Sequence, residues 1–420
     1  MTRGVPRDRA SRRNETVLVG FTAVTNLADG VVKITLPMLA LAAGGSAGQV
    51  AGVGLTLTLP WLLVSLPVGV LTDRTDRRRL VVVANLIRLA TVAVLFAASL
   101  TTGASGPPLL PVLYAVGFVI GVAEVVANTA VGAVVPAAVP AERRSGANAW
   151  IAGVETLANE FCGPAVGGLL VGVGAGVALG STVAAFAAGA VLMTLLAGRF
   201  RPGPGPGPGE ERVSRASLFA DVREGLSFLW RHRLLRTLSL TIAVLAGCWS
   251  AWLALLPSYA ASVLELDAAG YGLLVSAIGA GGLVGAVLTS AINRLLGVRW
   301  ALFADLVGTF LMMAVPALLP AAWAVGAAAF VGGMGGTLWT VNARTISQAL
   351  VPDRLLGRYG AAARLLGWGT LPLGAALAGL LAEAFGLHLA FAGFALAVAA
   401  LTVPFLRTVT PAELRAGGRG

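Results

Sequence analysis

The chain has 420 residues, of which 57% are hydrophobic and only 12% are charged, and its formal net charge is +11. Soluble domains carry about 25% charged residues, so the composition excludes an ordinary soluble protein and indicates a membrane protein. The positive charge does not indicate a nucleic-acid partner, because the basic residues lie in loops between apolar segments and form no single patch.

The first apolar segment covers residues 16–41 and follows an arginine-rich N-terminal stretch. It is far longer than the apolar part of a signal peptide, which has about 7–15 residues, so we expect an uncleaved first span. Asp29 lies near the centre of this segment, and Lys33 follows one turn later on the same helix face. Lys33 is therefore the expected charge partner of Asp29.

The hydropathy pattern predicts an all-α membrane protein with twelve spans, since a bilayer core requires about 20 apolar residues per helix. The expected spans are residues 16–41, 48–71, 80–101, 109–136, 146–172, 175–198, 237–262, 270–293, 299–319, 321–349, 357–384 and 386–407. We expect a tail at 1–15, a six-helix bundle at 16–200, a linker at 201–235, a second six-helix bundle at 236–408 and a tail at 409–420.

Arginines alternate between successive loops. They are present around 74–79, 143–144, 294–299 and 354–358, whereas the intervening loops contain no Arg or Lys. Because basic loops remain on the cytoplasmic side, both termini are predicted to be cytoplasmic in a cell membrane.

The central linker has two parts. Residues 201–209 alternate Pro and Gly, a pattern typical of a flexible segment. Residues 217–231 mix apolar and charged positions, which favours an interfacial helix on the cytoplasmic leaflet; a solvated linker helix is the alternative.

The two halves share a repeat. Val139-Pro140 and Val351-Pro352 each precede a charged turn and a Gly/Ala-rich span, and Gly167 and Gly379 follow the two prolines at the same offset. This repeat favours two related bundles, although chance similarity could produce part of it in a sequence so rich in Ala, Gly and Val.

Residues 69–80 resemble the loop between the second and third helices of the major facilitator superfamily. The resemblance implies the two-bundle fold of that superfamily and a cytoplasmic gate formed by Gly69, Asp73, Arg74, Arg77 and Arg78. When the cytoplasmic side is closed, we expect Asp73 to approach the helix start near residues 355–360, and Arg77 and Arg78 to be attracted to neighbouring acids. The family loop has Gly where this chain has Asp76, a change expected to weaken the turn.

Further runs at 26–30, 121–124, 342–348 and 351–358 resemble one branch of the superfamily, the drug and siderophore exporters similar to the enterobactin exporter and the macrolide efflux proteins. The run Gly163-Pro164-Ala165-Val166-Gly167-Gly168 is similar to a motif of antiporters in the superfamily. Plain helix packing through Gly163, Pro164, Gly167 and Gly168 is the alternative interpretation.

Acids inside apolar spans are expected to be functional, since an ionisable group is costly there. The proposed proton-coupling residues are Glu124, Asp29, Glu155 and Glu160. Glu124 ranks first because it has no basic partner on its own helix. Glu155 and Glu160 are expected to point in different directions. The fourth span lacks an Arg that many proton antiporters of the superfamily carry, which puts a borrowed coupling mechanism in doubt.

The remaining polar and aromatic candidates lie mainly in the second half. The predicted substrate cavity comprises Trp249, Trp252, Trp339, Asn342 and Trp368, with helix packing as the alternative role. Arg344 and Arg364, together with Arg88 of the first half, are expected to be gate or interface residues that extend toward the cytoplasmic surface.

These features predict a secondary active transporter that exports a small apolar or amphiphilic compound by proton antiport with alternating access. No phosphate-binding loop of an ATPase and no motif of a hydrolase is present, so we expect neither ATP use nor enzymatic activity. A proton-coupled metabolite importer and a lipid scramblase are the alternatives. No metal and no cofactor are expected; the expected partners are a small-molecule substrate, protons and membrane lipids, and the protein is expected to be a monomer.

Overall fold

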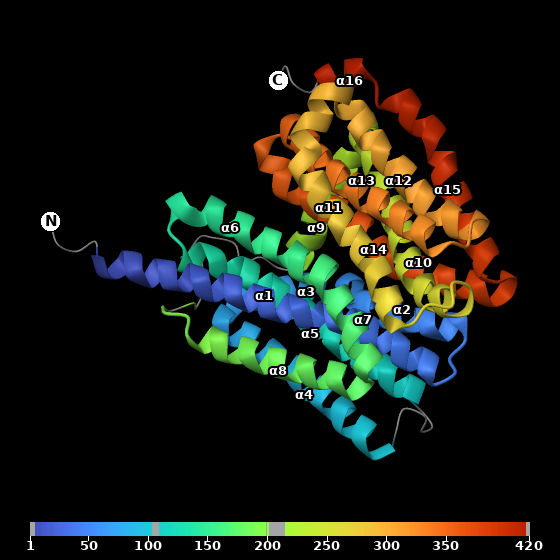
Figure 1. Ribbon diagram of the computed structural model, residues 1–420. Helices are drawn as coiled ribbons and strands as arrows, with labels where there is room; N and C mark the ends of the chain where they lie inside the picture. The colour runs from blue at the N-terminus through green and yellow to red at the C-terminus, as the bar shows by residue number, and fades with distance from the viewer. Residues whose placement is uncertain (1–4, 103–108, 199, 201–214, 417–420) are drawn as a thin grey trace. The chain divides into compact units, whose positions relative to one another are not determined.

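The computed structural model describes residues 5–102, 109–198, 200 and 215–416, and every regular element in these ranges is a helix. The chain divides into two compact units (Figure 1). The first unit comprises Met1–Gly205 together with Glu265–Ser276, and the second comprises Pro206–Leu264 together with Ala277–Gly420. The Pro/Gly-rich run predicted to be flexible lies outside the described residues.

The first unit contains nine of the helices described. They are α1 (Val5–Ala42), α2 (Ala47–Leu63), α3 (Ser65–Arg74), α4 (Arg77–Thr102), α5 (Leu109–Ala138), α6 (Ala141–Glu155), the π-helix η1 (Thr156–Cys162), α7 (Gly163–Val173) and α8 (Ala175–Thr194).

The helices that follow, apart from the beginning of α11, belong to the second unit. They are α9 (Arg215–Arg231), α10 (Arg233–Ser262), α11 (Ala268–Leu296), α12 (Val298–Leu318), α13 (Ala322–Leu350), α14 (Asp353–Phe385), α15 (Leu387–Thr408) and α16 (Pro411–Ala416). Residues 268–276 of α11 pack with the first unit.

The helices confirm the expected membrane fold. Eleven helical segments of the described chain are long and apolar enough to cross a bilayer, and Ala47–Leu63 is a shorter apolar helix, which is consistent with twelve spans. The second predicted span is interrupted at Val64, between α2 and α3. Pro67 explains this break, because it has no N–H to donate to the carbonyl group of Leu63 four residues earlier.

The fifth span changes its helix type in the middle. It begins as α6, continues as η1 and ends as α7. Pro164 cannot donate a hydrogen bond to the carbonyl group of Glu160, so a regular α-helix cannot pass through this point. The chain accommodates the proline with a wider turn, in which the N–H of Gly163 donates to the carbonyl oxygen of Ala158 five residues earlier.

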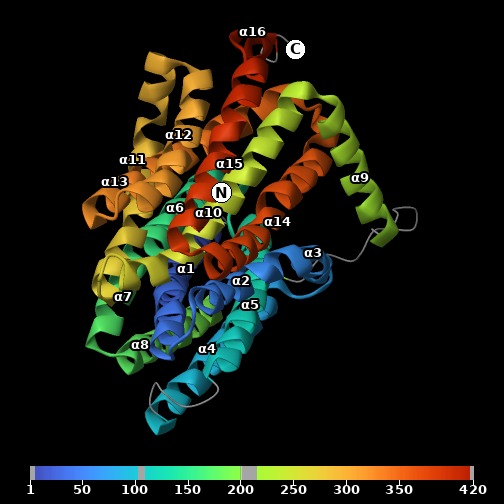
Figure 2. The same ribbon diagram turned by 90° about the vertical axis from the view of Figure 1, so that its right-hand side faces the viewer.

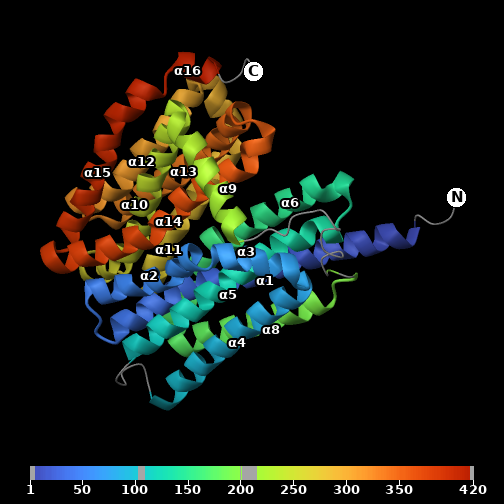
Figure 3. The ribbon, with the colours of Figure 1, turned by 180° about the vertical axis from the view of Figure 1, so that it is seen from behind.

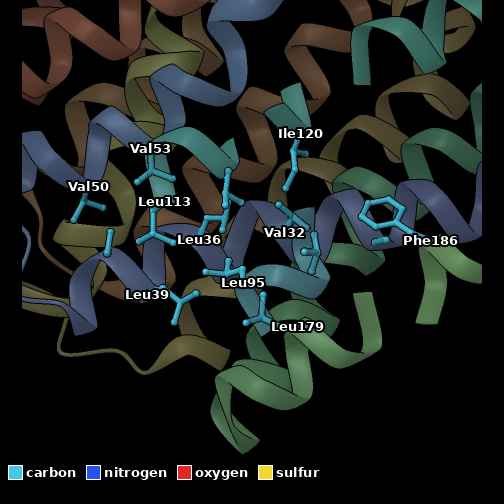
Figure 4. Close-up of a cluster of buried hydrophobic side chains, with 14 residues drawn as sticks. Val32, Leu36, Leu39, Val50, Val53, Leu95, Leu113, Ile120, Leu179 and Phe186 are labelled. Carbon is cyan, nitrogen blue, oxygen red and sulfur yellow. The ribbon is translucent and has the colours of Figure 1, made fainter. Parts of the chain in front are cut away.

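The apolar core of the first unit lies between α1 and its neighbours. Helices α1, α4, α5 and α8 run side by side (Figure 3). Figure 4 shows one cluster of buried side chains there, in which Val32 and Leu36 of α1 lie near Ile120 of α5 and Phe186 of α8. This packing holds α1 rigidly in the interior of the unit, and α1 carries the charged residues described below.

In the second unit, α9 packs against α14 and α10 (Figure 2). Leu229 of α9 is fully buried in a cluster with Val351, Leu355 and Tyr359. The helix predicted from the sequence at 217–231 is therefore present, and one of its faces is covered by protein.

Candidate functional site

A buried ion pair joins α1 to α4 in the first unit. A guanidinium nitrogen of Arg88 lies 3.2 Å from Oδ2 of Asp29, and both side chains are almost completely buried. The guanidinium group also lies over the ring of Phe186, 5.6 Å from its centroid. Arg88 therefore does not extend to the cytoplasmic surface as the sequence predicted, because a buried carboxylate and an aromatic face hold it inside the unit.

Lys33 has a different partner from the one predicted. Its ammonium group donates a hydrogen bond of 2.9 Å to Oδ1 of Asn159, and Nδ2 of Asn159 donates in turn to Oδ1 of Asn26 at 3.1 Å. Arg88, rather than Lys33, forms the ion pair with Asp29. The helical spacing of the sequence identified Lys33 as a neighbour of Asp29 on α1, but it gave no information about Arg88 on α4.

The π-helix places Asn159 against α1. Asn159 lies in the middle of η1 and is buried, with both functional atoms of its amide bound to α1 side chains. The same wide turn changes the relation between Glu155 and Glu160. Hydrogen bonds in a π-helix join residues five apart, so the angle around the helix between these two acids is smaller than in an α-helix. The charge of Glu160 acts on Glu155, and the expectation that the two side chains point in different directions stays a prediction.

Four acidic side chains interact electrostatically with one another and with the basic side chains Lys33 and Arg88. The charges of Glu124 and Glu155 act on Asp29, and Glu155 also interacts with Glu160, Glu124 and Lys33. Glu155, Glu160 and Lys33 are exposed, Glu124 is half-buried and Asp29 is buried. The four predicted acids therefore form one cluster, which we call the acidic cluster: Asp29, Glu124, Glu155 and Glu160, contributed by α1, α5, α6 and η1.

The glycine-rich run of the fifth span crosses α1 at close range. A methyl group added to Gly163 would lie 2.7 Å from Cα of Gly30, and one added to Gly167 would lie 3.0 Å from Cα of Val31. Gly168 makes a similar approach to α11, where an added methyl group would lie 3.1 Å from Cα of Gly272. Nearby, Ser276 donates a hydrogen bond of 2.7 Å to the carbonyl oxygen of Phe161. These are crossings at which only a hydrogen atom fits.

Two arginines of the predicted gate bind backbone carbonyl groups of neighbouring helices. Arg77 donates to the carbonyl oxygen of Ala133, and Arg78 donates to those of Met193 and Thr194 at the end of α8. A cation at a helix C-terminus satisfies free carbonyl groups and interacts favourably with the helix dipole, which describes Arg78 at α8. Ala133 lies before the last turn of α5, so Arg77 binds the side of that helix, and the two arginines tie α4 to α5 and α8. The acids expected to attract Arg77 and Arg78 are not their partners in these bonds.

Asp76 caps a helix in the same loop. Its Oδ1 accepts a hydrogen bond of 3.1 Å from the backbone N–H of Arg79, in the first turn of α4. An acid at this position stabilises the start of α4. The expectation that Asp76 weakens the turn, compared with the Gly of the family loop, stays a prediction. A methyl group added to Gly69 would meet nothing within 4 Å among the described atoms. Asp73 and Arg74 form the last two residues of α3, and the approach of Asp73 to residues 355–360 stays a prediction.

Most of the predicted substrate-cavity residues are packed inside the second unit. Trp252 is fully buried in α10, and Trp339 is buried in α13 with its ring 6.2 Å from that of Phe405. Asn342 exchanges two hydrogen bonds with Asn293. Of the predicted set, Trp368 keeps a surface that is 49% exposed, and Trp249 is half-buried and donates to Oγ1 of Thr309 at 3.3 Å.

Three further charged side chains lie within helices of the second unit. Arg344 and Arg364 are exposed on α13 and α14, and Arg364 donates to the carbonyl oxygen of Gly360 on its own helix. Asp305 is buried in α12 and accepts a long hydrogen bond of 3.4 Å from Thr309. No group of three or more metal-ligating side chains occurs among the described residues.

Comparison with known proteins gives one consistent result. Residues 20–415 match the family described as transmembrane secretion effector. The multidrug efflux pump Tap of Mycolicibacterium fortuitum is 29% identical over 415 residues, which cover 94% of this chain and 97% of that protein. The Tap pump of Mycobacterium tuberculosis (strain ATCC 25618 / H37Rv) is also 29% identical, over 95% of this chain and 96% of that protein.

Solved structures show the same fold at low identity. A bacterial homologue of the iron transporter ferroportin has a TM-score of 0.71 and 17% identity, covering 94% of this chain and 98% of that chain. A mutant of the nucleoside transporter NupG has a TM-score of 0.72 and 10% identity, covering 95% of this chain and 100% of that chain.

Proposed function

Because the chain belongs to the transmembrane secretion effector family of the major facilitator superfamily, and is therefore a multi-pass membrane transporter, we propose that it exports small apolar or amphiphilic compounds by proton antiport. Drugs, siderophores and secreted metabolites all fit this substrate class. The naming of its relatives as multidrug efflux pumps supports export, as does the antiporter-like run at residues 163–168.

The acidic cluster is the single observation that carries the proton-coupling proposal. Four carboxyl groups lie around two basic side chains, and one of these, Arg88, is already bound to Asp29. The described residues give Glu124 no hydrogen bond or ion pair. Because an ionisable group inside a span is costly and Glu124 has no basic partner on its own helix, Glu124 is the residue that we assign to proton binding, and Glu155 and Glu160 stand at the exposed side of the cluster.

Protonation of Glu124 would change the forces between helices. A neutral Glu124 no longer repels Asp29 and Glu155, so the free energy of packing α5 against α1 and α6 changes with its charge. A change that is stronger in one conformation than in the other shifts the population between them. Alternating access requires such a shift, with the close crossing of Gly163 and Gly167 over α1 as a contact around which helices rock.

We assign the remaining predicted residues to gating and substrate contact. Gly69, Asp73 and Arg74 belong to the moving cytoplasmic gate, and Arg77 and Arg78 anchor it to α5 and to the end of α8. Among the predicted cavity residues, Trp368 and Trp249 are the aromatic side chains that we assign to contact with an amphiphilic compound, because Trp252 and Trp339 are buried. Both termini are proposed to be cytoplasmic, because the arginine-containing loops lie on their side.

The test is transport by purified protein in proteoliposomes with an imposed pH gradient. Fluorescent cationic and neutral amphiphiles serve as substrates. Glu124→Gln is expected to abolish gradient-driven accumulation while substrate exchange without a gradient continues, since binding and rocking do not require the proton. Glu142→Gln, an exposed acid in the first turn of α6, is the matched control and should transport normally.

Two outcomes contradict this proposal. If Glu124→Gln still accumulates substrate against its gradient with normal pH dependence, coupling lies elsewhere, first at Asp29 and then at Glu155 or Glu160. If the wild-type protein accumulates substrate only in the direction of import, or transfers lipids with no ion gradient, then the proposal of export is wrong.

A further inference from the structure

Helix α9 has one face that is fixed to the second unit. Glu224 forms an ion pair with Arg358 of α14, and Gly225 lies so close to the same turn that an added methyl group would be 2.9 Å from the backbone nitrogen of Tyr359. Leu229, one turn later, is fully buried in the cluster with Val351 and Leu355. Positions 225 and 229 lie on one side of the helix, so this side is the docked face.

The opposite face of α9 is exposed and has a different composition. Arg223, Leu226, Ser227, Trp230 and Arg231 are all exposed, and their spacing places them on one side of the helix. Leu226 is 37% exposed and Trp230 is 49% exposed, which is a large apolar area for a short helix. We call these five residues the outer face of α9.

The position of α9 along the spans follows from its contacts. Its docked face touches Leu355 and Tyr359, which lie in the first turns of the span Leu355–Phe385. Its C-terminal end is followed after one residue by the span Arg233–Ser262. Helix α9 is therefore level with the ends of two spans, at the depth where lipid headgroups meet the acyl chains.

The charge of the outer face of α9 indicates which membrane component it binds. From Arg223 to Arg231 the sequence contains one acid, Glu224, and its carboxylate is bound to Arg358. Two arginines and a tryptophan thus face outward beside Leu226. Arg side chains attract anionic lipids, and Trp and Leu side chains enter the boundary between headgroups and acyl chains.

We propose that the outer face of α9 binds anionic phospholipid headgroups of the cytoplasmic leaflet. Arg223 and Arg231 contact the phosphate groups, and Leu226 and Trp230 enter the acyl boundary. The cytoplasmic location rests on the orientation proposed above. Because the docked face holds Arg358 and the first turns of α14, lipids that fix α9 also restrain the start of α14, which links membrane charge to a transport helix.

Full-length protein in lipid vesicles provides the test, with Trp230 as the probe. Vesicles contain phosphatidylcholine together with the same fraction of either brominated phosphatidylcholine or brominated phosphatidylglycerol. Bromine quenches tryptophan fluorescence on contact, and the difference between the wild type and Trp230→Phe isolates the signal of this residue from the other tryptophans. We expect brominated phosphatidylglycerol to quench Trp230 more strongly than brominated phosphatidylcholine at equal bromine content.

Charge removal then identifies the headgroup contact. Arg223→Gln and Arg231→Gln should each reduce the preference for phosphatidylglycerol by roughly fivefold, the factor expected for one arginine near an anionic surface. Arg407→Gln is the matched control, because Arg407 is also exposed and lies in the last turn of α15. Its preference should equal that of the wild type. Circular dichroism verifies that each variant is folded.

Two results overturn the inference. Equal quenching by both lipids would show that α9 contacts the membrane without recognising charge. No quenching of Trp230 by either lipid would show that the outer face meets water or another protein. The quenching measurement needs no substrate and no gradient. It can therefore be interpreted even if the proposed export function fails, and the transport assay can be interpreted even if the lipid proposal fails.

Discussion

At the residue scale, the clearest feature is the pairing of Asp29 with Arg88 inside the first unit. Both groups are buried, and the remaining atoms Oδ1 of Asp29 and Nε and Nη2 of Arg88 have no hydrogen-bond partner among the described residues. A buried pair of this kind contributes little net stability, but the loss of one partner leaves an uncompensated charge. The pair therefore fixes the relative position of α1 and α4.

This arrangement predicts an asymmetric pattern of stability. Arg88→Gln should lower the free energy of unfolding by about 3–5 kcal/mol, because Asp29 is left buried without a cation. The double variant Asp29→Asn/Arg88→Gln should recover a large part of this loss. Thermal unfolding in detergent measures both, and Arg79→Gln on the same helix is the control, since Arg79 is exposed. A double variant no more stable than Arg88→Gln would contradict the assigned role.

The sequence predicted which acids gather in the first unit, but it did not predict their partners. A carboxyl group within an apolar span is conspicuous, and this sufficed to select Asp29, Glu124, Glu155 and Glu160. The partner of Asp29 comes from another helix 59 residues away. Arg88 was itself an ionisable residue inside an apolar span, so the same rule applied to a basic side chain would have marked it as buried.

At the scale of elements, the fifth span combines a π-helix with a close helix crossing. The sequence predicted the tight contact through Gly163 and Gly167, because small residues four apart form one stripe of a helix. It did not predict the π-helix, because apolar periodicity cannot distinguish hydrogen bonds four residues apart from those five apart. The polar contact of Lys33 with Asn159 depends on this wide turn, so it could not be predicted either.

The close crossing predicts a sharp difference between two glycines of α7. Gly167→Leu should reduce transport strongly and lower the free energy of unfolding by about 1–3 kcal/mol, because the side chain must displace Val31 or Ile34 of α1. Gly172→Leu is the matched control, since an added methyl group there would meet nothing within 4 Å. Transport assays and detection of both variants in membranes measure the difference. Equal activity of the two would exclude a role for the crossing.

At the scale of the whole molecule, the main predictions from the sequence are two related bundles, indicated by the repeat, and the orientation, indicated by the distribution of arginines. Pro140 and Pro352 precede α6 and α14 with nearly the same backbone angles, φ −57° and ψ 152° against φ −54° and ψ 140°. The same local structure thus begins the fifth and the eleventh span. The span count and the helical fold followed from hydropathy, whereas the partition of α11 between two units could not be read from it.

The arginine-rich loops predict the orientation of the chain in the membrane. Reporter enzymes that require the cytoplasm should be active when fused to either terminus, and those that require export should be inactive there. A fusion within residues 264–267, between α10 and α11, should give the opposite result. An active exported reporter at either terminus would contradict the orientation.

The π-helix at Thr156–Cys162 also has a consequence for the history of the chain. A π-turn accommodates one residue more than an α-turn, so it is the structural trace expected of a one-residue insertion in an ancestral α-helix. In a homologue with an uninterrupted helix, an ungapped alignment would pair each position after Cys162 with a neighbour of its true counterpart. Residue roles transferred between such proteins across this segment therefore require a gap of one.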